Sequence, residues 1–153
     1  MAVLFLDIEG AFSNAVLEVL MHNLRKRGIP VKYIEFIRNM LKNWETMLRF
    51  DNYSSDLLTI DNGIGQGDPL SMVMYQFYNA NLLDILKDAN KNAMAYVDDT
   101  LMLAIADTFK DAHLKLANIM SKRGGIDEWS LTHNSRLECS KLALIDFAHR
   151  SNI

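Results

Sequence analysis

The chain has 153 residues, which is enough for one domain with a hydrophobic core and too few for two comfortable ones. Half of the residues are hydrophobic and 23% are charged, and this composition excludes an intrinsically disordered chain. The net charge of −3 argues mildly against nucleic acid as a partner, because phosphate contacts depend on lysine and arginine.

The chain begins with a predicted strand and a predicted helix. Residues 3–6 (VLFL) form an apolar run that is too short for a helix. We therefore expect a central strand that is covered on both faces and ends at Asp7. Apolar residues then recur at helical spacing, with Asn14 as the expected N-cap. Gly28, followed by Pro30, predicts the end of this helix after about three turns.

A second helix and a hairpin are expected next. From Ile34 to Trp44, apolar residues fall on one stripe at intervals of three or four, which is typical of an amphipathic helix. Two apolar segments, residues 47–50 and 57–60, flank the polar residues 51–56. This pattern predicts a β-hairpin with a loop of about four to six residues, which leads into a glycine-rich segment.

The middle of the chain is predicted to form the most buried helix and a tight hairpin. Pro69 suits the first position of a helix, and residues 70–86 are apolar on nearly every side. Residues 93–97 and 101–105 have the composition of two short strands. Residues 98–100 (DDT) join them, so we expect acidic residues at the hairpin tip.

The last third of the chain is predicted to contain one further helix and one further strand. Thr108 begins a pattern with the spacing of a capping box, and residues 109–120 continue with one apolar face. Gly124 and Gly125 break this helix. Residues 126–134 have no clear pattern, and residues 142–147 are expected to form the last strand.

The sequence predicts an intracellular protein without a membrane span. It contains no run of 18 apolar residues. The N-terminus reaches Asp7 after a few apolar residues and lacks the basic flank of a secretory signal. Cys139 is the single cysteine, so no intramolecular disulfide can form and no cysteine and histidine spacing indicates a structural zinc site.

Two aspartates are candidate metal ligands. Asp7 and Asp98 each end an apolar strand, where clustered carboxylates would be costly without a cation. Mg²⁺ takes oxygen ligands and binds one or two carboxylates together with substrate phosphates. Because neighbouring strand residues point to opposite faces, we expect Asp98 rather than Asp99 to be the main ligand. The alternative is that Asp98 and Asp99 simply fill a hairpin turn.

Three segments together resemble the motifs of the reverse transcriptase palm, in the same order and with similar spacing. They are residues 6–12 (LDIEGAF), residues 65–71 (GQGDPLS) and residues 96–99 (YVDD). The last segment matches the family's Tyr-X-Asp-Asp tetrad. Residues 134–141 (NSRLECSK) resemble the next motif, in a form similar to that of non-LTR retrotransposon proteins of fungi.

The resemblance implies catalytic roles for four residues. Asp7 and Asp98 would be the ligands of two catalytic Mg²⁺ ions, with Mn²⁺ as a substitute, and Asp99 would be a supporting acid. Lys141 corresponds to the lysine near the triphosphate, and we hypothesise that it gives general acid help. The alternative for Lys141 is an ordinary solvent-exposed lysine.

The same resemblance implies which residues contact substrates. Phe12 falls where the family keeps an aromatic ring under the incoming sugar, as a steric gate against a 2′-hydroxyl, although core packing explains Phe12 equally well. Gln66 and Gly67 match the loop that packs against the template base and the new base pair, and Tyr96 joins this substrate-binding group. Gly65 stands where many relatives have proline, which adds backbone freedom to the loop.

The implied fold is α+β, a polymerase palm-like antiparallel sheet with a ferredoxin-like core and helices packed on one face. Residues 1–153 would be a partial palm domain without fingers and thumb. The implied reaction is two-metal transfer of a nucleotide from a dNTP to a primer 3′-hydroxyl. Its partners would be an RNA template, a DNA primer and the dNTP, with the missing segments or a larger polyprotein. The family also implies a nuclear location.

Two alternatives to an active polymerase remain open. The chain could be a catalytically inactive retroelement remnant, because processive synthesis is not expected from a palm alone. It could also be a metal-dependent, nucleotidyl cyclase-like enzyme on a similar palm. The loop containing Gln66 and Gly67, with a hairpin before it, argues against the cyclase.

Overall fold

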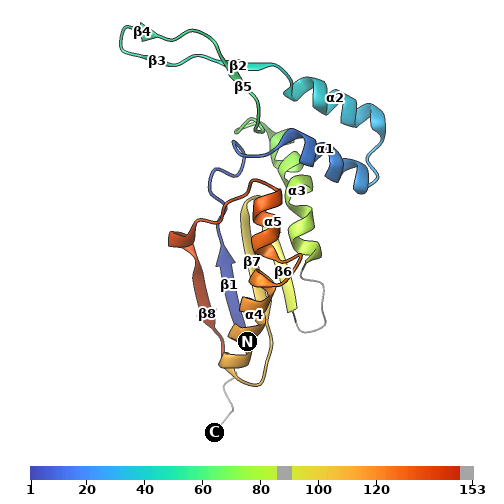
Figure 1. The fold of residues 1–153 in the computed structure, drawn as a ribbon, viewed down its shortest axis with the longest axis vertical. Coiled ribbons are helices and arrows are strands. Elements are labelled where there is room, and N and C mark those ends of the chain that lie inside the picture. Colours follow the sequence, from blue (N-terminus) through green and yellow to red (C-terminus); the bar gives the residue numbers. More distant parts are fainter. Residues whose placement is uncertain (86–90, 149–153) are drawn as a thin grey trace.

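The computed structural model describes residues 1–85 and 91–148, and its centre is a four-stranded antiparallel sheet (Figure 1). The strands are β1 (Ala2–Leu6), β6 (Lys91–Tyr96), β7 (Asp99–Ala104) and β8 (Ala143–Asp146). Their order is β6-β7-β1-β8, so β1 is a central strand, as predicted. Helices connect β1 to β6 and β7 to β8, which gives the predicted ferredoxin-like connectivity.

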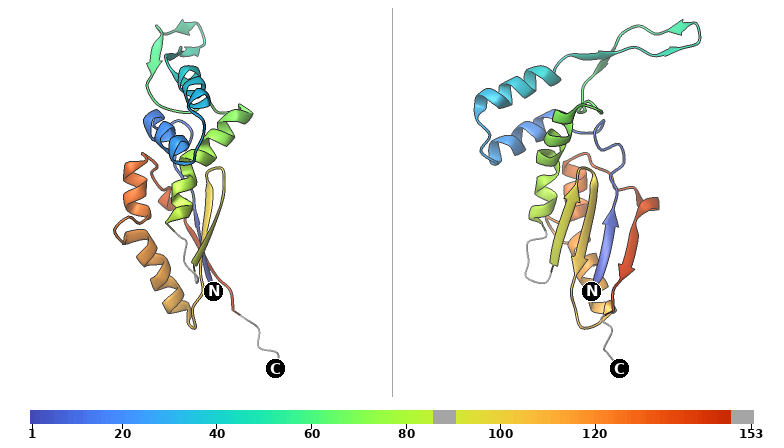
Figure 2. Two further views of the ribbon diagram at one scale, coloured as in Figure 1. Left: turned by 90° about the vertical axis from the view of Figure 1, so that its right-hand side faces the viewer. Right: turned by 180° about the vertical axis from the view of Figure 1, so that it is seen from behind.

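One face of the sheet packs against helices and the other is open. Leu6 on β1 pairs with Thr100 on β7, and both are buried on the helix side. Alternate residues point to the opposite side. There Phe5 is 39% exposed, and Met94 and Ile145 are also exposed. The prediction that β1 is covered on both faces is therefore wrong, because no helix of the described residues covers the face that carries Phe5 (Figure 2).

Five α-helices are described around this sheet. They are α1 (Leu17–Lys26), α2 (Val31–Leu41), α3 (Pro69–Asp84), α4 (Phe109–Ser121) and α5 (Ile126–Thr132). In Figure 2, α4 and α5 lie on one side of the sheet, while α1 and α2 lie beyond one of its ends. α3 packs against both α1 and β6, and α1 packs against α2, so α3 connects these two helices to the sheet. No helix among the described residues is both long and apolar enough to cross a membrane.

The predicted helix boundaries were partly wrong. Asn14 does not cap α1; its side chain instead donates a hydrogen bond to the Glu9 carbonyl (3.0 Å), which closes the loop after β1. Trp44 lies outside α2, in the short strand that follows it. The cap of α4 is confirmed, because the Thr108 hydroxyl accepts a hydrogen bond from the Asp111 amide (3.1 Å).

α3 carries more buried residues than any other described helix, as predicted. It begins at Pro69, and the Asp68 side chain caps it by accepting a hydrogen bond from the Leu70 amide (2.8 Å). The described helix ends at Asp84, and residue 86, to which it was predicted to extend, lies outside the described residues. Its buried side is partly polar and aromatic, with Ser71, Met74, Tyr75, Tyr78, Asn79 and Leu82.

A long hairpin projects from the body of the molecule between α2 and α3 (Figure 1). β2 (Trp44–Thr46) pairs with β5 (Leu58–Ile60), and β3 (Arg49–Phe50) pairs with β4 (Tyr53–Ser54). The predicted pairing of residues 47–50 with 57–60 is therefore wrong. Asp51, with φ of +49°, allows a tighter turn than the predicted four to six residues, because aspartate tolerates the left-handed conformation.

Candidate active site

Asp7 lies directly after β1, at the end of the sheet where residues 7–9 meet residues 136–138. Its backbone carbonyl accepts a hydrogen bond from the Glu138 amide (2.9 Å), and the Glu9 amide donates to the Arg136 carbonyl (2.8 Å). Between these two bonds, Ile8 forms an isolated antiparallel bridge with Leu137. The side chain of Asp7 is 24% exposed. These contacts fix the backbone of Asp7 while its carboxylate stays accessible.

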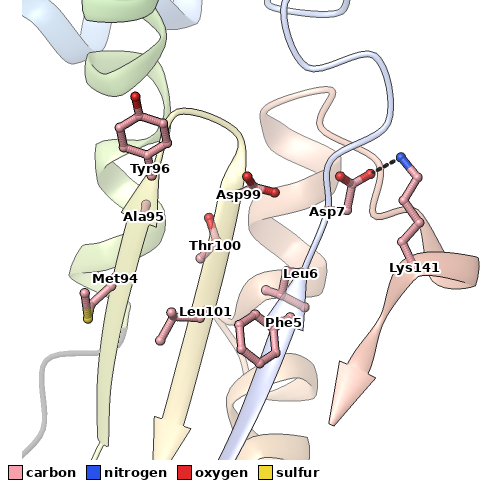
Figure 3. A pocket seen from close by; sticks show the side chains of 10 residues that line it. All are labelled: Phe5, Leu6, Asp7, Met94, Ala95, Tyr96, Asp99, Thr100, Leu101 and Lys141. Carbon is pink, nitrogen blue, oxygen red and sulfur yellow. Dashed lines mark hydrogen bonds and ion pairs between the residues drawn. The ribbon is translucent and has the colours of Figure 1, made fainter. Parts of the chain in front are cut away.

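Lys141 brings a positive charge to Asp7. Its Nζ donates a hydrogen bond to Asp7 Oδ2 at 2.9 Å (Figure 3). Lys141 ends the 3₁₀ turn Cys139–Lys141, and the Glu138 carboxylate stabilises this turn by accepting hydrogen bonds from the amide and hydroxyl of Ser140. The hydrogen bond to Asp7 raises the pKa of Lys141, and the negative charges of Glu138 and Asp98 act in the same direction. Lys141 is thus paired with Asp7, which lies between Lys141 and Asp99 in Figure 3.

The tip of the β6–β7 hairpin lies one residue earlier than predicted. Val97 and Asp98 form the turn, whereas Asp99 is already in β7 and pairs with Tyr96. Val97 has φ of +59°, which is rare for a β-branched residue. Asp98 is half-buried at the turn and Asp99 is exposed. The difference between the two aspartates therefore arises from the turn and not from alternation along a strand.

Asn79 supports this turn and was not predicted as a site residue. Its side-chain amide is buried and donates a hydrogen bond to the Val97 carbonyl at 3.3 Å. A polar residue in the middle of an apolar helix is the signal that could have found it, because buried polar groups need partners. Asn79 thus links α3 to the turn that carries Asp98.

Two cavities meet at the hairpin tip, and between them they include every predicted site residue. The first, of about 510 Å³, is shown in Figure 3 and is lined on its polar side by Asp7, Asp99, Tyr96 and Lys141. The second, of about 450 Å³, is lined by Phe12, Gln66, Gly67, Tyr96, Asp98 and Asp99. Tyr96 and Asp99 line both cavities, so the tip separates one from the other.

The glycine-rich loop is docked onto the loop that carries Phe12. The Ile64 amide donates to the Phe12 carbonyl (2.8 Å), and the Gly63 amide donates to the Ala15 carbonyl (2.8 Å). These bonds attach the loop before Gln66 and Gly67 to the segment that carries Phe12, and all three residues line the second cavity. Gly67 has φ of +97°, which favours glycine at this position.

Gly65 is explained by packing. A Cβ atom at this position would lie 2.6 Å from the Trp44 ring, so the indole occupies the space that a side chain would need. The Trp44 Nε1 donates to the Met40 carbonyl (2.7 Å), which holds the ring in place. The expected extra backbone freedom at Gly65 is thus limited by its contact with Trp44.

Phe12 is part of both the core and the cavity wall. Its ring stacks on Tyr75 with centroids 4.9 Å apart, and it also lines the second cavity. Both interpretations of Phe12 from the sequence, core packing and a wall of the substrate site, are compatible with this position.

The carboxylates offer hard oxygen donors of the kind that Mg²⁺ prefers. Asp7 already binds a cation, the ammonium of Lys141. The negative charge of Asp98 also raises the pKa of this ammonium. Among the described residues no group of three or more acids, histidines or cysteines forms a complete metal cage. Two carboxylates with substrate phosphates are nevertheless an ordinary environment for Mg²⁺, so the residues fit this ion.

Several named relatives of this chain come from retrotransposons. The chain is 29% identical over 107 residues to the Retrovirus-related Pol polyprotein from type-2 retrotransposable element R2DM of Drosophila melanogaster, covering 65% of this chain and 10% of that protein. It is 30% identical over 111 residues to the Pol polyprotein of a type-1 element R2 of Bradysia coprophila, covering 67% and 13%. The chain thus spans a small part of these relatives. The fungal assignment stays a prediction.

Solved structures of similar fold include telomerases. Apo telomerase from Candida tropicalis, truncated from its C-terminal domain, aligns with a TM-score of 0.71 at 14% identity, covering 99% of this chain and 32% of that one. Telomerase from the same organism in complex with a telomeric RNA fragment aligns with a TM-score of 0.68 at 12% identity, covering 94% and 26%. These similarities confirm the predicted palm-like α+β fold.

The family can be assigned from the sequence directly. Residues 1–135 match the family described as Reverse transcriptase (RNA-dependent DNA polymerase). This range contains seven of the eight predicted site residues, from Asp7 to Asp99, and Lys141 lies beyond it. The chain therefore belongs to the reverse transcriptase family.

Proposed function

We propose that this chain is the catalytic palm of an RNA-directed DNA polymerase, which adds dNTPs to the 3′-hydroxyl of a DNA primer on an RNA template. The meeting of three separate segments at one end of the sheet supports this proposal most strongly. Lys141 binds Asp7, and the pairing of Leu6 with Thr100 brings the end of β1 next to the hairpin turn that carries Asp98. Family membership supports the same chemistry.

Asp7 and Asp98 would hold the catalytic Mg²⁺ ions, with Asp99 as a supporting acid. When bound, the metal ions activate the primer hydroxyl and stabilise charge on the phosphate oxygens. Asp7 is fixed through its backbone, and Asp98 through the turn that Asn79 supports. The protein's contribution is therefore to hold two carboxylates in place before substrate arrives.

Lys141 has two successive roles in this proposal. It neutralises Asp7 in the absence of metal, through the hydrogen bond of 2.9 Å. The side chain of Lys141 is 64% exposed, so it can leave Asp7 when a metal takes its place. Its ammonium then remains near the triphosphate, where it can donate a proton to the leaving pyrophosphate.

Substrates would lie in the second cavity and across the hairpin tip. Phe12 forms the wall that we assign to the sugar of the incoming nucleotide, and Gln66 with Gly67 forms the wall that faces the base pair. Tyr96 is exposed between the two cavities, where it can contact the primer end. We regard the described residues as the palm, with grip on the duplex supplied by further segments of a larger polyprotein.

Primer extension on an RNA template tests the proposal. We expect the polyprotein that contains this chain to extend a DNA primer with Mg²⁺ or Mn²⁺, and Asp98→Asn to abolish extension, while Asp99→Asn reduces it less. Equal extension by wild type and Asp98→Asn would contradict the assignment of Asp98. Failure of the wild type to extend any primer would favour an inactive remnant.

An intracellular, nuclear location stays a prediction, which microscopy of the tagged protein would test.

A further inference from the structure

A row of three aromatic rings runs from the core to the wall of the second cavity. Phe12 stacks on Tyr75 at 4.9 Å with an interplanar angle of 26°, and Tyr75 stacks on Tyr78 at 5.8 Å with an angle of 29°. Tyr75 and Tyr78 are completely buried, whereas Phe12 is half-buried and lines the cavity. Phe12 is thus the ring of this row that faces the substrate site.

The inner end of the row is fixed to two other parts of the fold. The Tyr78 hydroxyl donates to the His133 carbonyl and accepts a hydrogen bond from the Val16 amide (3.2 Å). The His133 ring in turn stacks on Trp129 at 4.9 Å. Tyr78 is therefore tied to α5 and to the start of α1, so Tyr75 rests on a rigid support.

The Tyr75 hydroxyl is not explained by folding. It is buried and makes no hydrogen bond of standard geometry among the described residues, although the Ser135 side chain acts on it. Burial raises the pKa of Tyr75, and the charges of Tyr78 and Asp98 act in the same direction, while an interaction with the Ser135 side chain opposes them, so the phenol is neutral at ordinary pH. The ring of Tyr75 makes the contact with Phe12, so the ring rather than the hydroxyl is the structural element of interest.

We propose that Tyr75 is a positioning residue that fixes the Phe12 ring and thereby sets how strongly the site discriminates between deoxyribonucleotides and ribonucleotides. This inference rests on the proposed function of Phe12 as the wall beneath the sugar. The two sugars differ by one hydroxyl, so exclusion requires a wall that does not yield. Phe12 lies in a loop, and Tyr75 is the ring that backs it from the core.

Two substitutions of Tyr75 separate the ring from the hydroxyl. Tyr75→Phe keeps the stacking ring, whereas Tyr75→Leu removes it. Leu82→Ala is the matched control, because Leu82 is fully buried on the same helix, seven residues or about 10 Å further along. Circular dichroism verifies that each variant is folded.

The measured quantity is the ratio of kcat/KM for dCTP to that for CTP, which differ only in the 2′-hydroxyl, in single-nucleotide extension by the polyprotein that contains this chain. We expect Tyr75→Leu to lower the ratio about ten-fold, and Tyr75→Phe and Leu82→Ala to leave it within about two-fold of wild type. A general loss of stability would affect both substrates and would also appear in Leu82→Ala. An unchanged ratio in Tyr75→Leu would overturn the proposal.

A second measurement does not depend on polymerase activity. ¹³C relaxation of the Phe12 ring reports its order in solution, and we expect an ordered ring in wild type and Tyr75→Phe and a mobile ring in Tyr75→Leu. An ordered Phe12 in Tyr75→Leu would overturn the proposal even if no nucleotide is incorporated. Failure of the proposed function appears differently: the wild type is inactive, or Phe12→Val leaves the nucleotide ratio unchanged.

Discussion

Replacing Asn79 by alanine should loosen the turn that carries Asp98. The substitution removes the hydrogen bond from the Asn79 amide to the Val97 carbonyl, which is 3.3 Å long and buried. A hydrogen bond of this kind contributes about 1 kcal/mol net. Val97 has φ of +59°, a conformation that costs roughly 1–2 kcal/mol and needs support from its neighbours. The bond therefore offsets much of the strain in this turn.

The expected loss of stability is small and measurable. Loss of the hydrogen bond destabilises by about 1 kcal/mol, and the better helix propensity of alanine returns about half of that. The Asn79 Oδ1 has no partner among the described residues, so its removal adds no further loss. For a chain of this length, about 1 kcal/mol lowers Tm by roughly 2–4 °C, so we expect the net loss of about 0.5 kcal/mol to lower Tm by about 1–2 °C.

The effect on metal binding should be larger than the effect on Tm suggests. The hydrogen bond helps to hold Asp98 in its metal-binding position. If the binding free energy of Mn²⁺ is weakened by the full energy of this bond, about 1 kcal/mol, the affinity falls about five-fold. Thermal unfolding by circular dichroism and Mn²⁺ titration by electron paramagnetic resonance measure the two effects. Asn118→Ala is the control, because Asn118 is exposed on α4. Wild-type Tm and wild-type Mn²⁺ affinity in Asn79→Ala would refute the role of Asn79.

Four further predictions follow from single residues. Tyr75→Phe should increase the free energy of unfolding by about 1 kcal/mol in urea denaturation, because it removes a buried hydroxyl that makes no hydrogen bond of standard geometry among the described residues; a decrease would contradict this. Gly65→Ala should shift the fluorescence of Trp44, since the new Cβ would lie 2.6 Å from its ring; an unchanged spectrum would count against that contact. Burial lowers the pKa of His133 from its ordinary 6.5, so the unfolded chain binds the proton more tightly, and stability should fall as pH drops below about 6.5. His133→Gln should lose this part of the pH dependence, and an identical pH profile would exclude His133 as its source. Lys141→Gln should strengthen Mn²⁺ binding in the absence of nucleotide, because the ammonium no longer competes for Asp7; weaker binding would argue against that competition.

The sequence predicted the sheet well because its strands have short, distinct apolar patterns. β1, β7 and β8 lie within one or two residues of their predicted ranges. The prediction that β1 is covered on both faces was wrong, because an apolar run does not show on how many faces a strand is packed. Phe5 lies on the open face and is exposed although it belongs to such a run.

The details of the site depended on conformations that the sequence does not indicate. Val97 has a positive φ, which is rare for a β-branched residue, so the turn was predicted one residue too late. The ion pair between Lys141 and Asp7 joins residues 134 positions apart, and only the fold brings them together. Asn79 and Tyr75 resembled ordinary positions of a buried helix, because their contacts with Val97 and Phe12 are long-range.

The central claim is that Asp7 and Asp98 form one metal site, and Mn²⁺ titration of the chain tests it most directly. We predict that Asp7→Asn and Asp98→Asn each weaken binding and that the double variant is little weaker than either, because ligands of one site are strongly coupled. Asp107→Asn, an exposed aspartate before α4, should bind like wild type. Independent, additive losses, or a wild-type affinity in either single variant, would contradict the account.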